Sequence, residues 1–169
     1  MRGAAVLFAT LYLLHAVVAE VNSLLSGLHL WLFAGGLYVA YAALALPFQE
    51  GLAACLLGGF LCDAMAPVAF GTHAALFAVA YTIVFNVRER LQREETSVRV
   101  GVALLVNLAL YLFLSFLRLR LIHGAGGAWP RMLSDLVWSE AVVALIAPWF
   151  FALQLHSLIL ARAQPQRPA

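Results

Sequence analysis

Asp63, Arg118 and Glu140 are charged residues that lie inside apolar segments of this sequence. A charge near the middle of a membrane-spanning helix costs about 2.5–3.5 kcal/mol on insertion scales, so it must be neutralised, paired or placed beside water. Asp63 lies about 20 Å along a helix that begins near Glu50, and the other two residues fall at a comparable depth in later segments. We therefore expect these three residues to form a polar cluster shielded from lipid.

Three roles fit such a cluster. It can fix the register of the helices, it can contact a ligand or a partner protein, or it can relay protons or ions. The residue types alone leave these roles open.

A polar stripe follows the segment 98–122. Asn107, Tyr111, Ser115 and Arg118 are spaced by four, four and three positions, which places them on one face of a helix. We expect this face to point into the protein. A single asparagine usually joins helices by hydrogen bonds, whereas a full stripe can also line a hydrated pocket.

Residues for catalysis or metal binding do not form a known motif. His15, His73 and His156 lie in different segments, without the close spacing that zinc sites use. There is no Gly-rich phosphate loop, no Gly-x-Ser-x-Gly and no His-Glu-x-x-His. The 10 basic and 8 acidic residues leave only a small positive excess, with no basic tract for nucleic acid. We expect no enzyme activity, no metal, no cofactor and no nucleic-acid partner.

Composition indicates what surrounds these residues. The chain is 64% hydrophobic and 11% charged, with a mean hydropathy of +0.95, whereas soluble domains carry roughly 25% charge. Long apolar runs occupy residues 3–20, 28–46, 51–70, 73–87, 98–122 and 136–161. Because lipid offers the backbone no hydrogen-bond partner, such runs predict helices. We predict an all-α integral membrane bundle of about six transmembrane helices, formed by one domain over residues 1–162, and a short disordered cytoplasmic tail over 163–169.

The positions of the arginines predict the orientation, since cytoplasmic loops carry the positive charge. With six spans, the side of both termini receives seven of them: Arg2, Arg88, Arg90, Arg93, Arg99, Arg162 and Arg167. The opposite side receives three: Arg118, Arg120 and Arg131. We expect both termini in the cytoplasm. The alternative at the N-terminus is a cleaved signal peptide, because an apolar run ends in Val17-Val18-Ala19.

The segment 51–70 is rich in small residues that allow close helix packing. One line at four-residue spacing holds Ala54, Gly58, Cys62 and Ala66, and the adjacent line holds Cys55, Gly59 and Asp63. Small residues at this spacing let backbones approach in lipid. We therefore expect this helix to be central in the bundle, with Gly35, Gly36 and Gly101 as candidate contacts. Pro148 should kink the last helix.

One pattern resembles a known family. Leu46-Pro47, Gly59, Asp63 and Gly71 read as Leu-Pro-x(11)-Gly-x(3)-Asp-x(7)-Gly, which is similar to the rod shape-determining protein MreD. The length, the charged loop after the fourth segment and the aromatic-rich last segment agree in outline. Ala64-Met65-Ala66-Pro67 departs from the Ser-Gly-type turn that is common in the family. In physical terms, Gly59 allows close approach, Asp63 is a carboxylate on an inner face, and Gly71 permits a positive φ between helices.

The resemblance implies a non-enzymatic component of the bacterial inner membrane, in the complex that elongates the cell. Its implied partners are an MreC-like bitopic membrane protein, the actin-like MreB filament, the peptidoglycan synthases and membrane lipid. The implied fold is similar to that of the substrate-binding subunits of energy-coupling-factor vitamin transporters. The alternative function is therefore a vitamin-binding transporter subunit, with an outward-facing pocket lined by Asp63, Arg118 and Glu140.

Overall fold

The computed structural model describes residues 2–25, 27, 30–66, 69–91, 95–121 and 129–163. Its six α-helices are α1 (Arg2–Leu25), α2 (Gly35–Ala45), α3 (Phe48–Met65), α4 (Thr72–Val87), α5 (Thr96–Leu121) and α6 (Trp129–Ala163), with a short 3-10 helix η2 (Arg88–Arg90) after α4. The all-α prediction is confirmed. The expected tail began at residue 163, but Ala163 still belongs to α6. The rest of the tail, 164–169, and Arg93 lie outside the described residues.

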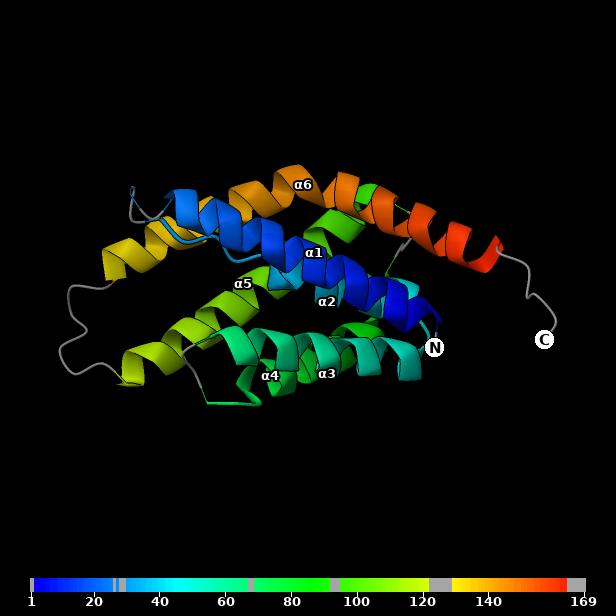
Figure 1. The fold of residues 1–169 in the computed structure, drawn as a ribbon, viewed down its shortest axis with the longest axis horizontal. Coiled ribbons are helices and arrows are strands. Elements are labelled where there is room, and N and C mark those ends of the chain that lie inside the picture. The colour runs from blue at the N-terminus through cyan, green and yellow to red at the C-terminus, as the bar shows by residue number, and fades with distance from the viewer. Residues whose placement is uncertain are drawn as a thin grey trace.

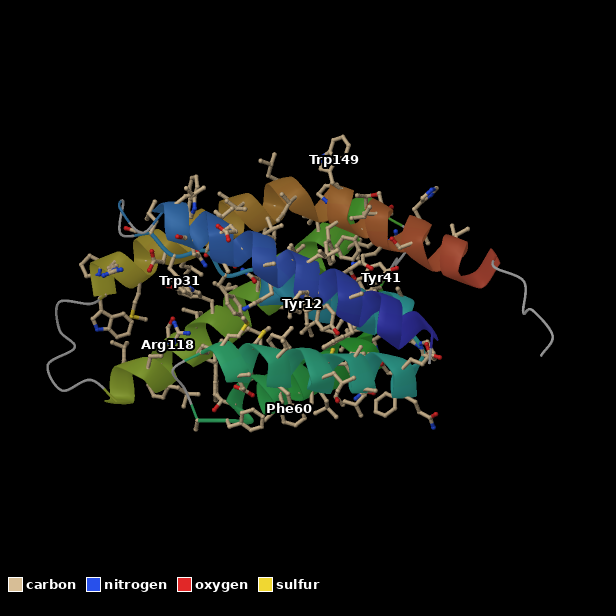
Figure 2. The ribbon with its side chains drawn as sticks, viewed as in Figure 1. Tyr12, Trp31, Tyr41, Phe60, Arg118 and Trp149 are labelled. Atoms are coloured by element: carbon tan, nitrogen blue, oxygen red, sulfur yellow. The ribbon has the colours of Figure 1, made fainter. Side chains whose placement is uncertain are left out.

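The helices run side by side along the length of the molecule (Figure 1). α1 begins and α6 ends at the same end of the bundle. α6 forms an arch, and Trp149, which follows Pro148, stands at its crest in Figure 2. This bend agrees with the predicted kink, because a proline inside a helix removes one backbone hydrogen bond.

The innermost helix is α2. Every residue from Gly36 to Ala43 is buried, because α3, α4, α5 and α6 all contact this helix. Our expectation that α3 is the central helix was therefore wrong. α3 buries Ala54, Gly58 and Gly59 on one face but exposes the opposite face, where Leu57 is 51% exposed.

The predicted helix over 28–46 forms only in part. α2 begins at Gly35, and residues 30–34 precede it as non-helical backbone. The gap between the predicted segments 3–20 and 28–46 is also partly helical, because α1 continues to Leu25. Hydropathy could not locate the start of α2, since residues 30–34 are as apolar as the helix that follows them.

Glycines set the closest approaches between the helices. A Cβ atom at Gly59 would lie 2.2 Å from the Cα of Ala74, and one at Gly36 would lie 2.4 Å from the Cα of Asn107. These two glycines bring α3 against α4 and α2 against α5. The predicted contact at Gly101 was wrong, because nothing lies within 4 Å of a Cβ built there.

The outer faces of the helices carry large apolar side chains. Leu24 is 82% exposed, Trp149 79% and Phe70 72%. Two described helices contain stretches that are long and apolar enough to cross a membrane, Thr96–Leu119 and Trp129–Ser157. Shorter apolar helical stretches cover Phe8–Leu24 and Gly35–Ala45.

Replacing Gly59 tests the contact between α3 and α4. In Gly59→Ala the new methyl group would meet backbone rather than a movable side chain, so we expect a loss of about 1–3 kcal/mol in the free energy of unfolding. Gly101→Ala is the matched control, and there we expect no loss and a gain of up to about 1 kcal/mol from helix propensity. Denaturant titration of the purified variants measures both. Equal stability of the two variants would contradict the described packing.

Candidate functional site

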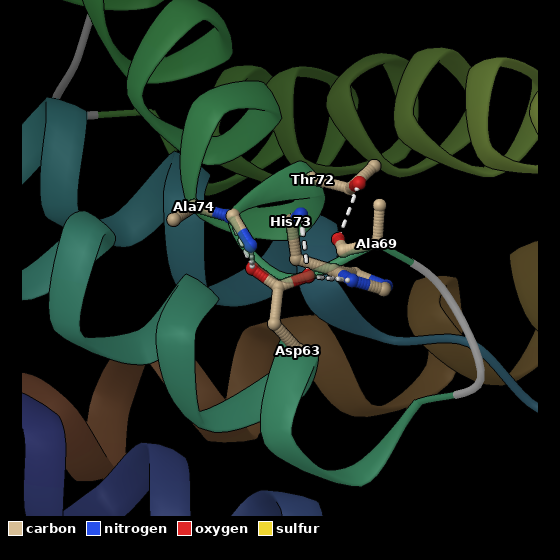
Figure 3. A network of polar contacts seen from close by, with 6 residues as sticks. Asp63, Ala69, Thr72, His73 and Ala74 are labelled. Carbon is tan, nitrogen blue, oxygen red and sulfur yellow. Dashed lines mark hydrogen bonds and ion pairs between the residues drawn. The ribbon is translucent and has the colours of Figure 1, made fainter.

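The carboxylate of Asp63 caps the N-terminus of a neighbouring helix. Oδ2 accepts hydrogen bonds from the backbone N–H of Gly71 at 2.9 Å and of Ala74 at 3.2 Å. Oδ1 accepts one from the backbone N–H of His73 at 2.8 Å and lies 2.8 Å from the Nδ1 atom of the same residue. Figure 3 shows this network, together with the Thr72 hydroxyl donating to the carbonyl of Ala69. Asp63 itself is only 4% exposed.

The position of this carboxylate follows from the needs of the helix it caps. The first N–H groups of a helix have no partner within the helix, and together they form the positive end of its dipole. α4 has no side-chain cap from its own N-cap residue, which is Gly71. Gly71 has a φ of 95°, which glycine adopts without strain. The close approach predicted at Gly59, the inner-face carboxylate at Asp63 and the positive φ at Gly71 are confirmed, whereas the cap that Asp63 forms was not predicted. The three residues build one junction between α3 and α4.

A second side chain caps α2 in the same way. Asn107 on α5 is fully buried, and its Oδ1 accepts a hydrogen bond from the N–H of Gly36 at 3.1 Å. Its amide nitrogen donates to the carbonyl of Phe33 and to Oε1 of Glu140, both at 3.1 Å. Asn107 thus joins α2, α5 and α6.

The non-helical residues before α2 are held by side chains of α1 and α6. Asn22 pairs with both backbone groups of Leu32, accepting at 2.6 Å and donating at 3.0 Å. Asp135 accepts from the N–H of Trp31 at 2.9 Å. Ser139 accepts from the N–H of Phe33 at 3.0 Å and donates to the carbonyl of Trp31 at 3.3 Å. Residues 31–33 thus find side-chain partners for both the N–H and the C=O groups.

The other end of α2 is capped by an arginine. Arg88 donates from one terminal nitrogen to the carbonyls of Ala43 at 3.1 Å and Leu46 at 2.9 Å. Its guanidinium carbon also lies 3.6 Å from the ring centroid of Phe85. A cation at a helix C-terminus complements the negative end of the dipole. α2 is therefore fixed at both ends by other elements.

A cavity of about 320 Å³ lies between α1, residues 31–35, the end of α3 and the start of α4. Its walls are mostly apolar, and its polar lining includes His15, Asn22, His73 and Arg118. Arg118 reaches it from α5. The start of α1 and the end of α6 lie at one end of the bundle. Figure 2 shows Arg118 and Trp31 toward the opposite end.

The expected three-residue cluster separates into different sites. Asp63 binds the start of α4, and Glu140 accepts from Asn107. Within the part of the chain that the structure describes, no hydrogen bond or ion pair joins Arg118 to either carboxylate, and the Nε atom of Arg118 is buried without a partner. The predicted inward stripe on α5 is confirmed, since Asn107, Tyr111 and Ser115 are buried and Arg118 lines the cavity.

Several site residues were not predicted from the sequence. Asn22 lies between the predicted segments 3–20 and 28–46, and Arg88 lies in the charged loop after the fourth segment. Asp135 and Ser139 lie near the start of the last segment. Each is a polar residue beside an apolar run, and this position in the sequence could have marked it as a candidate. Its partners could not be predicted, because they are backbone groups that only the fold brings near. His73 was assessed only as a metal ligand, and the described residues contain no group of three His, Cys, Asp or Glu side chains suited to a metal.

Comparison with protein-family models, with curated proteins and with solved structures gives no match. The similarity to MreD therefore stays a prediction from the sequence motif.

Removing the Asp63 carboxylate tests the cap on α4. Asp63→Ala leaves the N–H groups of Gly71, His73 and Ala74 without this acceptor, so we expect a loss of at least about 2 kcal/mol in the free energy of unfolding. Glu140→Gln is the control, because it keeps the oxygen that accepts from Asn107 and removes a partly buried charge. We expect its stability to be unchanged or higher. Thermal unfolding of the purified variants gives both values, and a neutral Asp63→Ala would refute the cap.

Proposed function

We propose that this protein is a non-enzymatic component of a bacterial inner membrane that acts, like MreD, as a scaffold of the cell-elongation complex. In this proposal the bundle binds the membrane helix of an MreC-like partner. It thereby helps couple MreB to peptidoglycan synthesis along the side wall. The proposal combines a membrane location, a rigid bundle and the sequence motif, each supported as follows.

The outer surface supports a membrane location for the whole bundle. Large apolar side chains such as Leu24, Phe70 and Trp149 face outward. Exposed apolar side chains are favourable against lipid and unfavourable against water. α2 is only 11 residues long, which is about 16 Å of helix. Residues 30–34 can add at most about 17 Å, so the two together can approach the hydrocarbon thickness of about 30 Å. Non-helical backbone at that depth is tolerated where protein surrounds it.

The observation that carries the proposal is the junction of α3 and α4. Gly59, Asp63 and Gly71 give the motif its similarity to MreD, and they meet at one junction: Gly59 brings α3 against Ala74, and Asp63 caps α4 beside the turn at Gly71. Residues that cooperate in one structural unit form a more specific pattern than residues that merely share a spacing. The vitamin-transporter alternative gains less support, because Asp63 and Glu140 do not line the cavity that Arg118 lines.

A scaffold of this kind works by presenting a fixed shape. Buried polar contacts hold α2 at both ends and α4 at its start, so the outer helix faces keep one arrangement. In lipid, helices associate by close packing and hydrogen bonds rather than by the hydrophobic effect. A partner helix would therefore recognise the shape of this surface. Both termini would lie in the cytoplasm, on the side of the MreB filament.

Depletion in the source bacterium tests the proposed function. We expect depleted cells to lose their rod shape, and the MreC-like protein to co-purify with the tagged wild-type chain. Re-expression of Glu140→Gln should restore the shape, whereas Asp63→Ala should not, because the start of α4 is then uncapped. Membrane levels of each variant are measured in the same cells. Cells that stay rod-shaped without the protein, and without a second copy of its gene, would refute the assignment.

A further inference from the structure

The cavity described above combines apolar walls with a cationic region. Leu14, Val18, Leu32 and Met65 are among the apolar lining residues, and the described lining includes no aspartate or glutamate. An empty apolar cavity can stay dry, but this one also receives the side chain of Arg118. The mixture is the pattern expected of a ligand site, in which a few polar groups orient an otherwise apolar molecule.

The charge of Arg118 is not balanced within the described bundle. Arginine stays protonated in proteins, and the Nε atom of this side chain is buried without a hydrogen-bond partner. The carboxylates of Asp63 and Glu140 are engaged by other groups, and that of Asp135 accepts from the N–H of Trp31. A partly buried cation without an ion-pair partner is unfavourable, because the surroundings replace only part of its lost hydration.

Two histidines add hydrogen-bonding groups to the same cavity. The Nδ1 atom of His73 lies 2.8 Å from the carboxylate of Asp63. Since a carboxylate accepts, this nitrogen carries the hydrogen, and Nε2 is the ring nitrogen that Asp63 leaves free. His15 lines the cavity from α1. Three different elements therefore direct nitrogen-bearing side chains to one cavity.

From this arrangement we infer that the cavity binds an amphiphile with a single anionic head group, a carboxylate or a phosphate. The head group pairs with Arg118 and lies near His15 and His73, and the adjoining apolar part lies against Leu14, Val18 and Met65. The volume of about 320 Å³ is at the small end of the roughly 300–1,000 Å³ of ligand pockets. It fits a head group and a short apolar portion, so the rest of a long chain would lie outside. This inference goes beyond the scaffold role and needs no partner protein.

Native mass spectrometry of the full-length protein in detergent tests this inference. The probes are dodecanoate, which represents a free fatty acid, and phosphatidic acid, which represents a membrane lipid with an anionic phosphate head group. The tighter of the two identifies the source. Dodecanol is the uncharged control, and inorganic phosphate is the head group alone. We expect both anionic amphiphiles to bind and both controls to bind at least about tenfold more weakly, because each lacks one of the two interactions.

Three variants assign the binding to this cavity. Arg118→Gln should weaken the anionic amphiphiles by at least about tenfold, and Val18→Trp should do so by filling the space while keeping the charge. Arg131→Gln is the matched control, because Arg131 is exposed and does not line the cavity. Arg118→Gln should also leave the thermal stability of the ligand-free protein equal or higher, since it removes an unpaired buried charge.

The inference is overturned by any of three results. The first is that dodecanol binds as tightly as dodecanoate, and the second is that inorganic phosphate binds as tightly as phosphatidic acid. The third is that folded Arg118→Gln binds the anionic amphiphiles like the wild type.

Discussion

The polar groups of the backbone need partners wherever a helix begins or ends among apolar helices. Water supplies these partners at a protein surface, but lipid and apolar side chains cannot. In this protein other helices supply them. Asp63 on α3 accepts from the start of α4, and Asn107 on α5 accepts from the start of α2. Both side chains are buried. Asp63 caps the helix that follows its own after a turn, whereas Asn107 caps a helix that is distant along the chain.

This requirement explains the unusual form of α2. The helix is short, lies inside the other helices, and is preceded by non-helical backbone. Such a segment is stable only if side chains replace the missing helical hydrogen bonds, and Asn22, Asp135 and Ser139 do so along residues 31–33. Arg88 completes the arrangement at the far end. The cavity lies beside this segment and α1, and Arg118 lines it from α5.

The sequence predicted the parts of the structure that depend on local composition. Apolar runs located most helices, and the spacing of polar residues on α5 placed Asn107, Tyr111 and Ser115 inward. The motif predicted the close approach at Gly59, the buried carboxylate at Asp63 and the positive φ at Gly71, but it did not predict that Asp63 caps α4. The expected cluster of Asp63 and Glu140 with Arg118 was wrong, because a similar depth in separate segments does not bring side chains together. Three backbone N–H groups and a histidine satisfy Asp63 instead. The non-helical residues 30–34 were missed because hydropathy is the same for a helix and for other buried backbone.

Amide hydrogen exchange of the protein in lipid nanodiscs tests the central claim most directly, which is that side chains from other helices satisfy and shield the backbone at the breaks. The N–H groups of Leu32 and Phe33, outside any helix, should exchange as slowly as those within α2, while the N–H groups of η2, where Glu89 and Arg90 are exposed, should exchange quickly. If residues 31–33 exchange as fast as η2, the backbone there is bonded to water, and the account given for α2, the cavity and the bundle is contradicted.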